Sequence, residues 1–270
     1  MPQTLTPGTG GGGSGGQTAA SGSGGTGTGG AMITGTGGTS IDAGSGGQGA
    51  SGGASGGRSP AFDGGASPAT DAGTGTPQTF VCSSVLGLML TSQWYTGGFE
   101  TAPGIDNARW QLKWMEHAYI DEWANVNSTF WGITPVSPCA QNSDSPDRVV
   151  LIALSWTITT LAEWESNVTK DVENIKVKYP NVKQIVLMTI VRGPGNKSCG
   201  NTTVVAENTL VPAYIDQALA DVAAKDPTLV KVGPKAEGAS CADFMGTGPH
   251  LTAAGDMAVA KVIAAGLTAL

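Results

Sequence analysis

The sequence predicts an α/β domain, a three-layer α/β/α architecture with a parallel, flavodoxin-like sheet, preceded by a disordered glycine-rich tract. Two observations lead to this prediction. The composition changes sharply near residue 80, and beyond that point short apolar segments alternate with helical ones. Strands that alternate with helices indicate βαβ units, whose right-handed crossovers place helices on both faces of a parallel sheet. We therefore divide the 270 residues into a tract, 1–79, and one domain, 80–270.

The tract is distinguished by its glycine content. Residues 1–80 hold 28 of the 42 glycines, whereas every Trp, Tyr, Cys and His lies beyond them. So little apolar surface cannot offset the entropy of ordering, and a passive, disordered tether with a reach of about 50 Å is expected. The tract shows no secretory signal. Either a signal or anchor segment is missing from the sequence, or the domain is exported by another route.

The composition also excludes several classes of function. The net charge is −7 and no Lys/Arg cluster occurs, which argues against a nucleic-acid partner. No stretch approaches the roughly 18 apolar residues of a transmembrane helix. With two histidines and no CxxC spacing, the sequence predicts neither a metal site nor a cofactor. We expect a monomer.

The first two predicted elements of the domain are a strand and a helix. Segment 84–90 is a short apolar run, which is typical of a strand buried on both faces. Segment 105–124 has helical periodicity, because Trp110, Trp114 and Ala118 recur at intervals of four.

The remaining elements continue the alternation of strands and helices. In an open parallel sheet, ligands bind beyond the carboxyl ends of the strands. Function is therefore expected in the loops that follow the strands, at 91–104, 155–158, 192–203 and 234–252. The strands are predicted at 149–154, 183–191 and 229–232, and the helices at about 159–178, at 204–225 with a break near Pro212, and at 253–268.

The same map of strands sorts the four cysteines into two pairs. Cys199 and Cys241 both follow strands and so lie at the carboxyl edge, whereas Cys82 and Cys139 both precede strands and lie nearer the amino edge. We predict the disulfides Cys82–Cys139 and Cys199–Cys241, each worth about 3–4 kcal/mol in the chain-entropy model. Disulfides favour an oxidising compartment, and we expect the protein outside the cell or on its surface.

Two side chains at the predicted carboxyl edge suggest nucleophilic chemistry. Ser92 follows the first strand directly, and His250 precedes the last helix, for which Thr252 is a suitable N-cap. A serine becomes a nucleophile only when a base takes its proton, and His250 is the natural base. The alternatives are a turn or cap serine and a loop histidine with a structural hydrogen bond.

The segment GPHLTAAGDMAVAKVIAAGL resembles the final block of the SGNH (GDSL-like) hydrolases. In that block a His is followed by Leu-Thr, a small residue, Gly and an Ala-rich helix, and the resemblance extends over about residues 80–268. It implies that His250 is the general base and Ser92 the nucleophile, with Thr91 in the place of the family's Asp. A register shifted by one residue would instead put Gln93 at the nucleophile position.

The chain departs from the family in its other motifs. The family's Asp lies three residues before the His, where this chain has Thr247; Asp243 lies seven before it and would serve if the loop folds back. The Gly-x-Asn-Asp block should follow the middle strand, but the residues at 153–157 are ALSWT. The oxyanion hole would then use backbone N–H groups, namely those of Ser92 and Gly97 or Gly98, with Asn107 as a further donor.

Three other residues are expected to contact a substrate. Trp94, in the predicted nucleophile loop, would stack on a sugar ring or else belong to the core. Arg192 follows the central strand and would orient a substrate carboxylate, pair with Asp243, or stabilise its own loop. Trp156 follows the strand 149–154 and would also line the site. His117 is expected as a partly buried helix residue.

Two functions follow from these residues, and the expected ligand is a carbohydrate or a small ester. The first is a secreted or surface-tethered serine ester hydrolase that removes acyl groups, acetyl above all, from a carbohydrate: Ser92 attacks and His250 carries the proton. The alternative is a non-catalytic carbohydrate-binding module on a degenerate SGNH fold, which the missing motifs favour.

Overall fold

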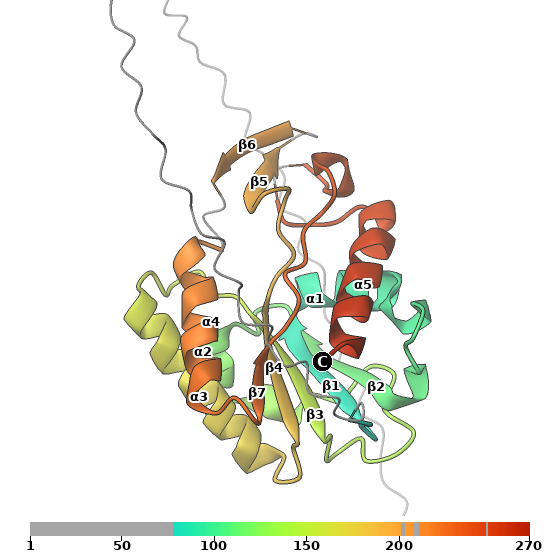
Figure 1. Cartoon of the computed structure of the whole chain (residues 1–270), viewed down its shortest axis with the longest axis vertical. Helices are drawn as coiled ribbons and strands as arrows, with labels where there is room; N and C mark the ends of the chain where they lie inside the picture. The colour runs from blue at the N-terminus through green and yellow to red at the C-terminus, as the bar shows by residue number, and fades with distance from the viewer. Residues whose placement is uncertain (1–77, 201–202, 208–210, 247) are drawn as a thin grey trace, which may run out of the picture. The chain divides into compact units, whose positions relative to one another are not determined.

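The computed structural model describes residues 78–200, 203–207, 211–246 and 248–270. Five parallel strands form a sheet in the order β2-β1-β3-β4-β7 (Figure 1). Counted along the chain, their order is 2-1-3-4-5, which is the flavodoxin-like arrangement, so the predicted fold class is confirmed. The strands are β1 (Ser83–Leu88), β2 (Trp110–Met115), β3 (Arg148–Ala153), β4 (Gln184–Thr189) and β7 (Val230–Val232).

Some of the sequence-based predictions concern residues that the structure does not describe. Residues 1–77, which make up nearly all of the predicted tract, lie outside the described residues, and so does Thr247. No helix among the described residues is long and apolar enough to cross a membrane.

The three central strands form the core of the sheet. Every residue of β1, β3 and β4 is buried, because helices cover both faces and leave no polar side exposed. Their registers align Val85 with Val150, and Val150 with Val186. The apolar runs that predicted these strands are therefore the residues at the centre of the core.

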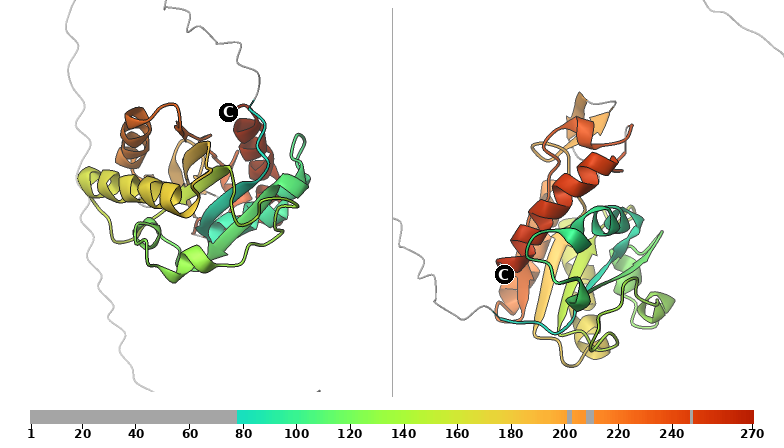
Figure 2. Two further views of the ribbon diagram at one scale, coloured as in Figure 1. Left: turned by 90° about the horizontal axis from the view of Figure 1, so that it is seen from below. Right: turned by 90° about the vertical axis from the view of Figure 1, so that its right-hand side faces the viewer.

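The helices lie in two layers. Helices α1 (Met89–Gly97) and α5 (Ala253–Thr268) pack together on one face of the sheet, and α3 (Leu161–Lys178) and α4 (Ala213–Lys225) pack together on the other (Figures 1 and 2). Two of these helices begin at a signal that the sequence shows: Thr160 accepts a hydrogen bond from the Glu163 N–H at the start of α3, and Pro212 precedes α4. Helix α5 has the bounds that the sequence predicted.

The predicted helix 105–124 is wrong. It comprises the short 3-10 helix η2 (Asn107–Arg109), strand β2 and a single helical turn, α2 (Ile120–Trp123). The tryptophans at positions 110 and 114 fit this structure equally well, because a spacing of four is also two periods of a strand. The polar residues between the tryptophans favoured an amphipathic helix over a buried strand. In the structure, however, Gln111 is buried, and its carboxamide donates a hydrogen bond to the Ser143 carbonyl.

Two boundaries also differ from the prediction. Strand β1 ends at Leu88 and α1 begins at once, so most of the expected loop 91–104 is helical. The expected helix 204–225 begins only at Ala213, because β6 (Thr203–Glu207) pairs antiparallel with β5 (Lys197–Gly200). This hairpin projects beyond the sheet at its carboxyl edge (Figure 1).

Both predicted disulfides are present in the structure. Cys82 joins Cys139 next to the start of β1, and Cys199 of β5 joins Cys241 in the short 3-10 helix η4 (Cys241–Asp243). The first disulfide ties the amino edge of the sheet, and the second ties the β5–β6 hairpin to the segment that leads into α5.

The amino edge is also held by a buried carboxylate. Asp147 accepts hydrogen bonds from the N–H groups of Val81 and Cys82 and pairs with the Lys183 ammonium at 3.1 Å. Burial would raise the pKa of this carboxyl, but these three partners outweigh burial and lower it. Asp147 therefore anchors the chain where it enters β1.

Candidate functional site

The candidate site lies at the carboxyl edge of the sheet, above β1. Strand β1 stands between β2 and β3, which is the point where the strand order reverses and where open parallel sheets bind ligands. The segments that follow β2 and β3 meet there, since the Ile120 N–H bonds to the Leu154 carbonyl at 3.0 Å. Helix α1 and the segment before α5 complete the edge.

His250 is held at this edge by the backbone of its own segment. The Met245 N–H bonds to the His250 carbonyl at 2.8 Å, and Phe244 and Leu251 form an antiparallel bridge. Thr252 then caps α5, accepting from the Gly255 N–H at 3.1 Å as the sequence predicted. The imidazole is therefore fixed at the start of α5 and is half-buried.

The partner of His250 is Gln93. The Gln93 Nε2 lies 3.0 Å from the His250 Nδ1, and the Gln93 Oε1 accepts from the Leu251 N–H at 3.3 Å. The second bond fixes the orientation of the carboxamide, because a backbone N–H can only donate. Its Nε2 therefore donates, Nδ1 accepts, and the proton of the neutral ring lies on Nε2. The one unprotonated nitrogen of the ring is thus occupied by Gln93.

Ser92 lies beside Gln93 but does not meet the imidazole. Its hydroxyl donates to the Met89 carbonyl at 2.7 Å, a bond to the preceding turn of α1 that is common for serine in helices. Both residues are described, and no hydrogen bond joins Ser92 to His250. The residue directly after β1 is Met89, whose thioether has no proton to give up.

Asp243 also has a different partner from the one expected. Its carboxylate accepts from the Ser240 N–H at 2.9 Å and completes the capping box of η4. No hydrogen bond or ion pair in the described part of the chain joins Asp243 to His250. Its backbone carbonyl accepts from Thr252, so Asp243 positions the segment before α5 through the main chain.

The expected oxyanion donors do not come together. The Gly98 N–H caps α1 by bonding to the Trp94 carbonyl, so it is not available to a substrate. Gly97 lies at the end of α1 against Asp256 of α5. Asn107 belongs to η2, just before β2, and therefore lies at the amino edge, opposite to His250. Gly97 and Gly98 thus lie at the end of α1 and not in a loop, and Asn107 lies at the other edge because strand β2 replaces the predicted helix.

Trp94 and Arg192 are interior residues, and neither is accessible to a substrate. Each is only 2% exposed. Trp94 packs edge-on against Phe99, with ring centroids 5.4 Å apart. Arg192 forms a two-bond ion pair with Asp216 of α4 and also donates to Thr189. The expected pairing of Arg192 with Asp243 is therefore wrong, and the guanidinium joins β4 to α4.

Trp156, in contrast, is at the surface where the sequence placed it. It follows β3 and is 54% exposed, and Met115 at the end of β2 is 42% exposed. His117 also lies at this edge, exposed, with its Nδ1 3.3 Å from the Tyr119 hydroxyl. The sequence-based prediction missed the position of His117 because it assigned the residue to a long helix.

A small cavity lies beneath the site. It is too small to hold a water molecule, and most of the residues that line it are apolar. Ligand contacts at this edge would therefore be made at the surface. The residues that line the cavity are Leu90, Thr91, Trp94, Ile190, Val191, Pro249 and Leu251.

Comparison with known proteins finds similarity among solved structures only. No protein-family model matches the chain, and no curated protein does. One crystal structure is 17% identical, with a TM-score of 0.45, and covers 70% of this chain and 96% of its own. The C-terminal catalytic domain of Streptococcus pneumoniae peptidoglycan O-acetyltransferase A, solved with a methylsulfonyl adduct, is 16% identical, with a TM-score of 0.40, and covers 70% and 90%.

Proposed function

We propose that residues 80–270 form a non-catalytic carbohydrate-binding module on a degenerate SGNH-type scaffold. The observation that carries this proposal is the pairing of His250 with Gln93. A general base must offer an unprotonated nitrogen to the hydroxyl it activates. Here the imidazole offers that nitrogen to a carboxamide, which cannot act as a nucleophile.

The residue that follows β1 supports the same proposal. The resemblance to the SGNH hydrolases expects a serine directly after the first strand, and this chain has Met89 there. Ser92 lies one helical turn later, and its hydroxyl is bonded within α1. Together with the missing Asn and Asp motifs, these features favour binding over turnover.

A carbohydrate ligand is favoured by the surface chemistry of the edge. Trp156 exposes an indole face on which the apolar face of a sugar ring can stack. The same edge of the sheet carries groups that exchange hydrogen bonds with hydroxyls, namely the Nε2–H of His250 and the pair formed by His117 and Tyr119. The two disulfides favour a location outside the cell or on its surface.

The test is a glycan-binding measurement on the full chain, followed by Trp156→Ala. We expect saturable binding of at least one polysaccharide, and about a fivefold loss of affinity in the variant, because stacking on an aromatic ring is worth about 1 kcal/mol. Val177→Ala is the control, since Val177 is 68% exposed on α3 and away from the site. Absence of glycan binding, or equal affinity of Trp156→Ala and the wild type, would contradict the proposal.

A second candidate is the serine ester hydrolase, which the proximity of Ser92 to the Gln93–His250 pair favours. If Gln93 released Nδ1, the Ser92 hydroxyl could attack an acyl carbon while His250 took its proton and passed it to the leaving alcohol. Release of nitrophenol from nitrophenyl acetate separates the two functions. Turnover that Ser92→Ala abolishes would establish the esterase, whereas the binding module predicts no release above buffer.

A further inference from the structure

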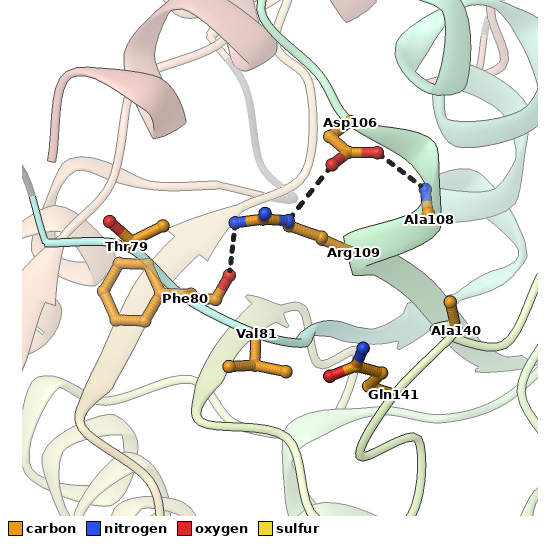
Figure 3. Close-up of a pocket in the computed structure, with 8 residues that line it drawn as sticks. All are labelled: Thr79, Phe80, Val81, Asp106, Ala108, Arg109, Ala140 and Gln141. Atoms are coloured by element: carbon orange, nitrogen blue, oxygen red, sulfur yellow. Dashed lines mark hydrogen bonds and ion pairs between the residues drawn. The ribbon is translucent and has the colours of Figure 1, made fainter.

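A second groove lies at the amino edge of the sheet, opposite to the site described above. It consists of two adjoining cavities of about 270 and 300 Å³. Both are lined by Thr79, Phe80, Asp106 and Arg109, where the chain that enters β1 runs beside η2. Figure 3 shows the first of these cavities.

Arg148 is a buried cation at the wall of this groove. It is 6% exposed, lines the larger cavity, and lies between the rings of Phe80 and Trp110 at 4.4 and 4.5 Å. Its guanidinium donates to the Ser83 hydroxyl and the Leu267 carbonyl, each at 3.0 Å. No carboxylate of the described residues lies within ion-pair distance of it.

The charge of Arg148 is therefore poorly compensated. Burial lowers the pKa of its guanidinium to about 10, although the neighbouring Asp147 charge acts in the opposite direction. Asp147 itself is bound to Val81, Cys82 and Lys183. A buried cation without a close counter-ion is costly unless an anion or further hydrogen-bond acceptors complete its environment.

Arg109 provides a second guanidinium in the same groove. It is 49% exposed and spans the groove between two partners, as Figure 3 shows. Its Nε pairs with Asp106 at 3.1 Å, and one Nη reaches the Phe80 carbonyl at 3.5 Å, the limit of a hydrogen bond. A guanidinium has five N–H donors, so Arg109 retains donors for a ligand.

We propose that this groove is a binding site for a small oxyanion, a carboxylate or a phosphate group, held between Arg148 and Arg109. The charged residues that line the larger cavity are these two arginines and Asp106, so the groove is locally positive in a chain of net charge −7. The planar fork of a guanidinium matches both oxyanions with two parallel hydrogen bonds. The Phe80 ring supplies an apolar wall beside them.

The test is calorimetric titration of the full chain with inorganic phosphate and, separately, with acetate, in sodium chloride at constant ionic strength. We expect saturable binding of at least one of them. Arg109→Gln should weaken it about tenfold, whereas Asp106→Asn should strengthen it several-fold because a competing carboxylate is removed. Lys176→Gln is the matched control, since Lys176 is 43% exposed and paired with Asp226 on another part of the surface.

The two ligands also distinguish the sources of the oxyanion. Binding of phosphate alone identifies a phosphate-bearing ligand, and binding of acetate alone identifies a carboxylate-bearing one; either supports the site. The proposal is overturned if neither ligand produces saturable heat, or if Arg109→Gln and Lys176→Gln bind with equal affinity. Both variants change exposed side chains, so a failure to fold is not expected to obscure the result.

Discussion

At the scale of single residues, two buried aspartates lie in opposite environments and are expected to affect stability in opposite ways. Asp147 is surrounded by donors, whereas Asp171 on α3 is fully buried and neither of its oxygens has a hydrogen-bond partner among the described residues. Burial raises the pKa of the Asp171 carboxyl well above its ordinary value, and the charge of Asp121 adds to this.

Asp171→Asn should stabilise the domain at pH 7. Because the pKa of Asp171 is higher in the folded state than in the unfolded state, the fold is most stable in acid, where the carboxyl is protonated in both states. The wild type then loses stability as the pH rises from the unfolded-state pKa to the folded-state pKa. The variant carries no charge to bury, so urea unfolding at pH 7 should show a gain of about 1–3 kcal/mol. Asp221→Asn on the exposed face of α4 is the control, and a less stable Asp171→Asn would refute this account.

Asp147→Asn should have the opposite effect. Because the pKa of Asp147 is lower in the folded state than in the unfolded state, the ionised carboxylate stabilises the fold at pH values above the unfolded-state pKa. This stabilisation is lost as the pH falls through the folded-state pKa. At pH 7 we expect a loss of about 1–3 kcal/mol, because two N–H groups lose a charged acceptor. The difference between variant and wild type should shrink towards pH 2; a difference that is the same at both pH values would argue against the ionic contribution.

At the scale of elements, the sequence predicts a helix or a strand correctly where the apolar pattern fits only one of them, and it fails where the pattern fits both. The runs at 149–154 and 253–268 locate β3 and α5 closely, because the first has the length of a buried strand and the second has the length of a helix and follows an N-cap. The tryptophans of β2 fit both periods, and the error moved Asn107 and His117 to wrong positions. The disulfides were predictable because they depend only on which edge each cysteine occupies.

The pairing of Gln93 with His250 could not be predicted from spacing. It depends on where β1 ends and α1 begins, and a boundary that moves by one residue rotates the helix by about 100°. In the comparison of this chain with the SGNH hydrolases, a register shifted by one residue already puts Gln93 at the nucleophile position. The structure places that side chain, and not Ser92, against the imidazole.

Gly255→Ala tests how the segment before α5 is held. Alanine normally stabilises a helix by about 1 kcal/mol over glycine. Here a Cβ would lie 2.2 Å from the Asp243 carbonyl, so η4 would have to move away from α5. We expect a loss of about 1–3 kcal/mol in urea unfolding and a changed imidazole signal of His250 in NMR spectra.

Gly132→Ala is the control for that variant, because nothing lies within 4 Å of its Cβ position. Equal stabilities of the two alanine variants, with an unchanged His250 signal, would contradict the tight packing of η4 against α5.

At the scale of the whole molecule, the two edges of one sheet present different chemistry. The carboxyl edge carries the exposed Trp156 and the Gln93–His250 pair, whereas the amino edge carries the arginine groove and the Cys82–Cys139 disulfide. Because the sheet and its two helix layers contain the core, both edges depend on one cooperative unit.

Removal of residues 1–77 should leave this unit intact. Among the described residues, the core cluster runs from Val85 to Leu267, so the truncated chain should form both disulfides and unfold cooperatively within a few degrees of the full chain. Thermal unfolding of the two chains and their masses under non-reducing conditions check this. Loss of a cooperative transition in the shorter chain would show that the domain proposed for 80–270 is not sufficient.

We propose that the imidazole of His250 binds Gln93 and activates no nucleophile. The most direct test is the intact mass of the full chain after incubation with a fluorophosphonate, which forms an adduct with an activated serine. We predict an unchanged mass. An adduct of one equivalent that maps to Ser92 and disappears in His250→Ala would contradict the claim and establish a serine hydrolase.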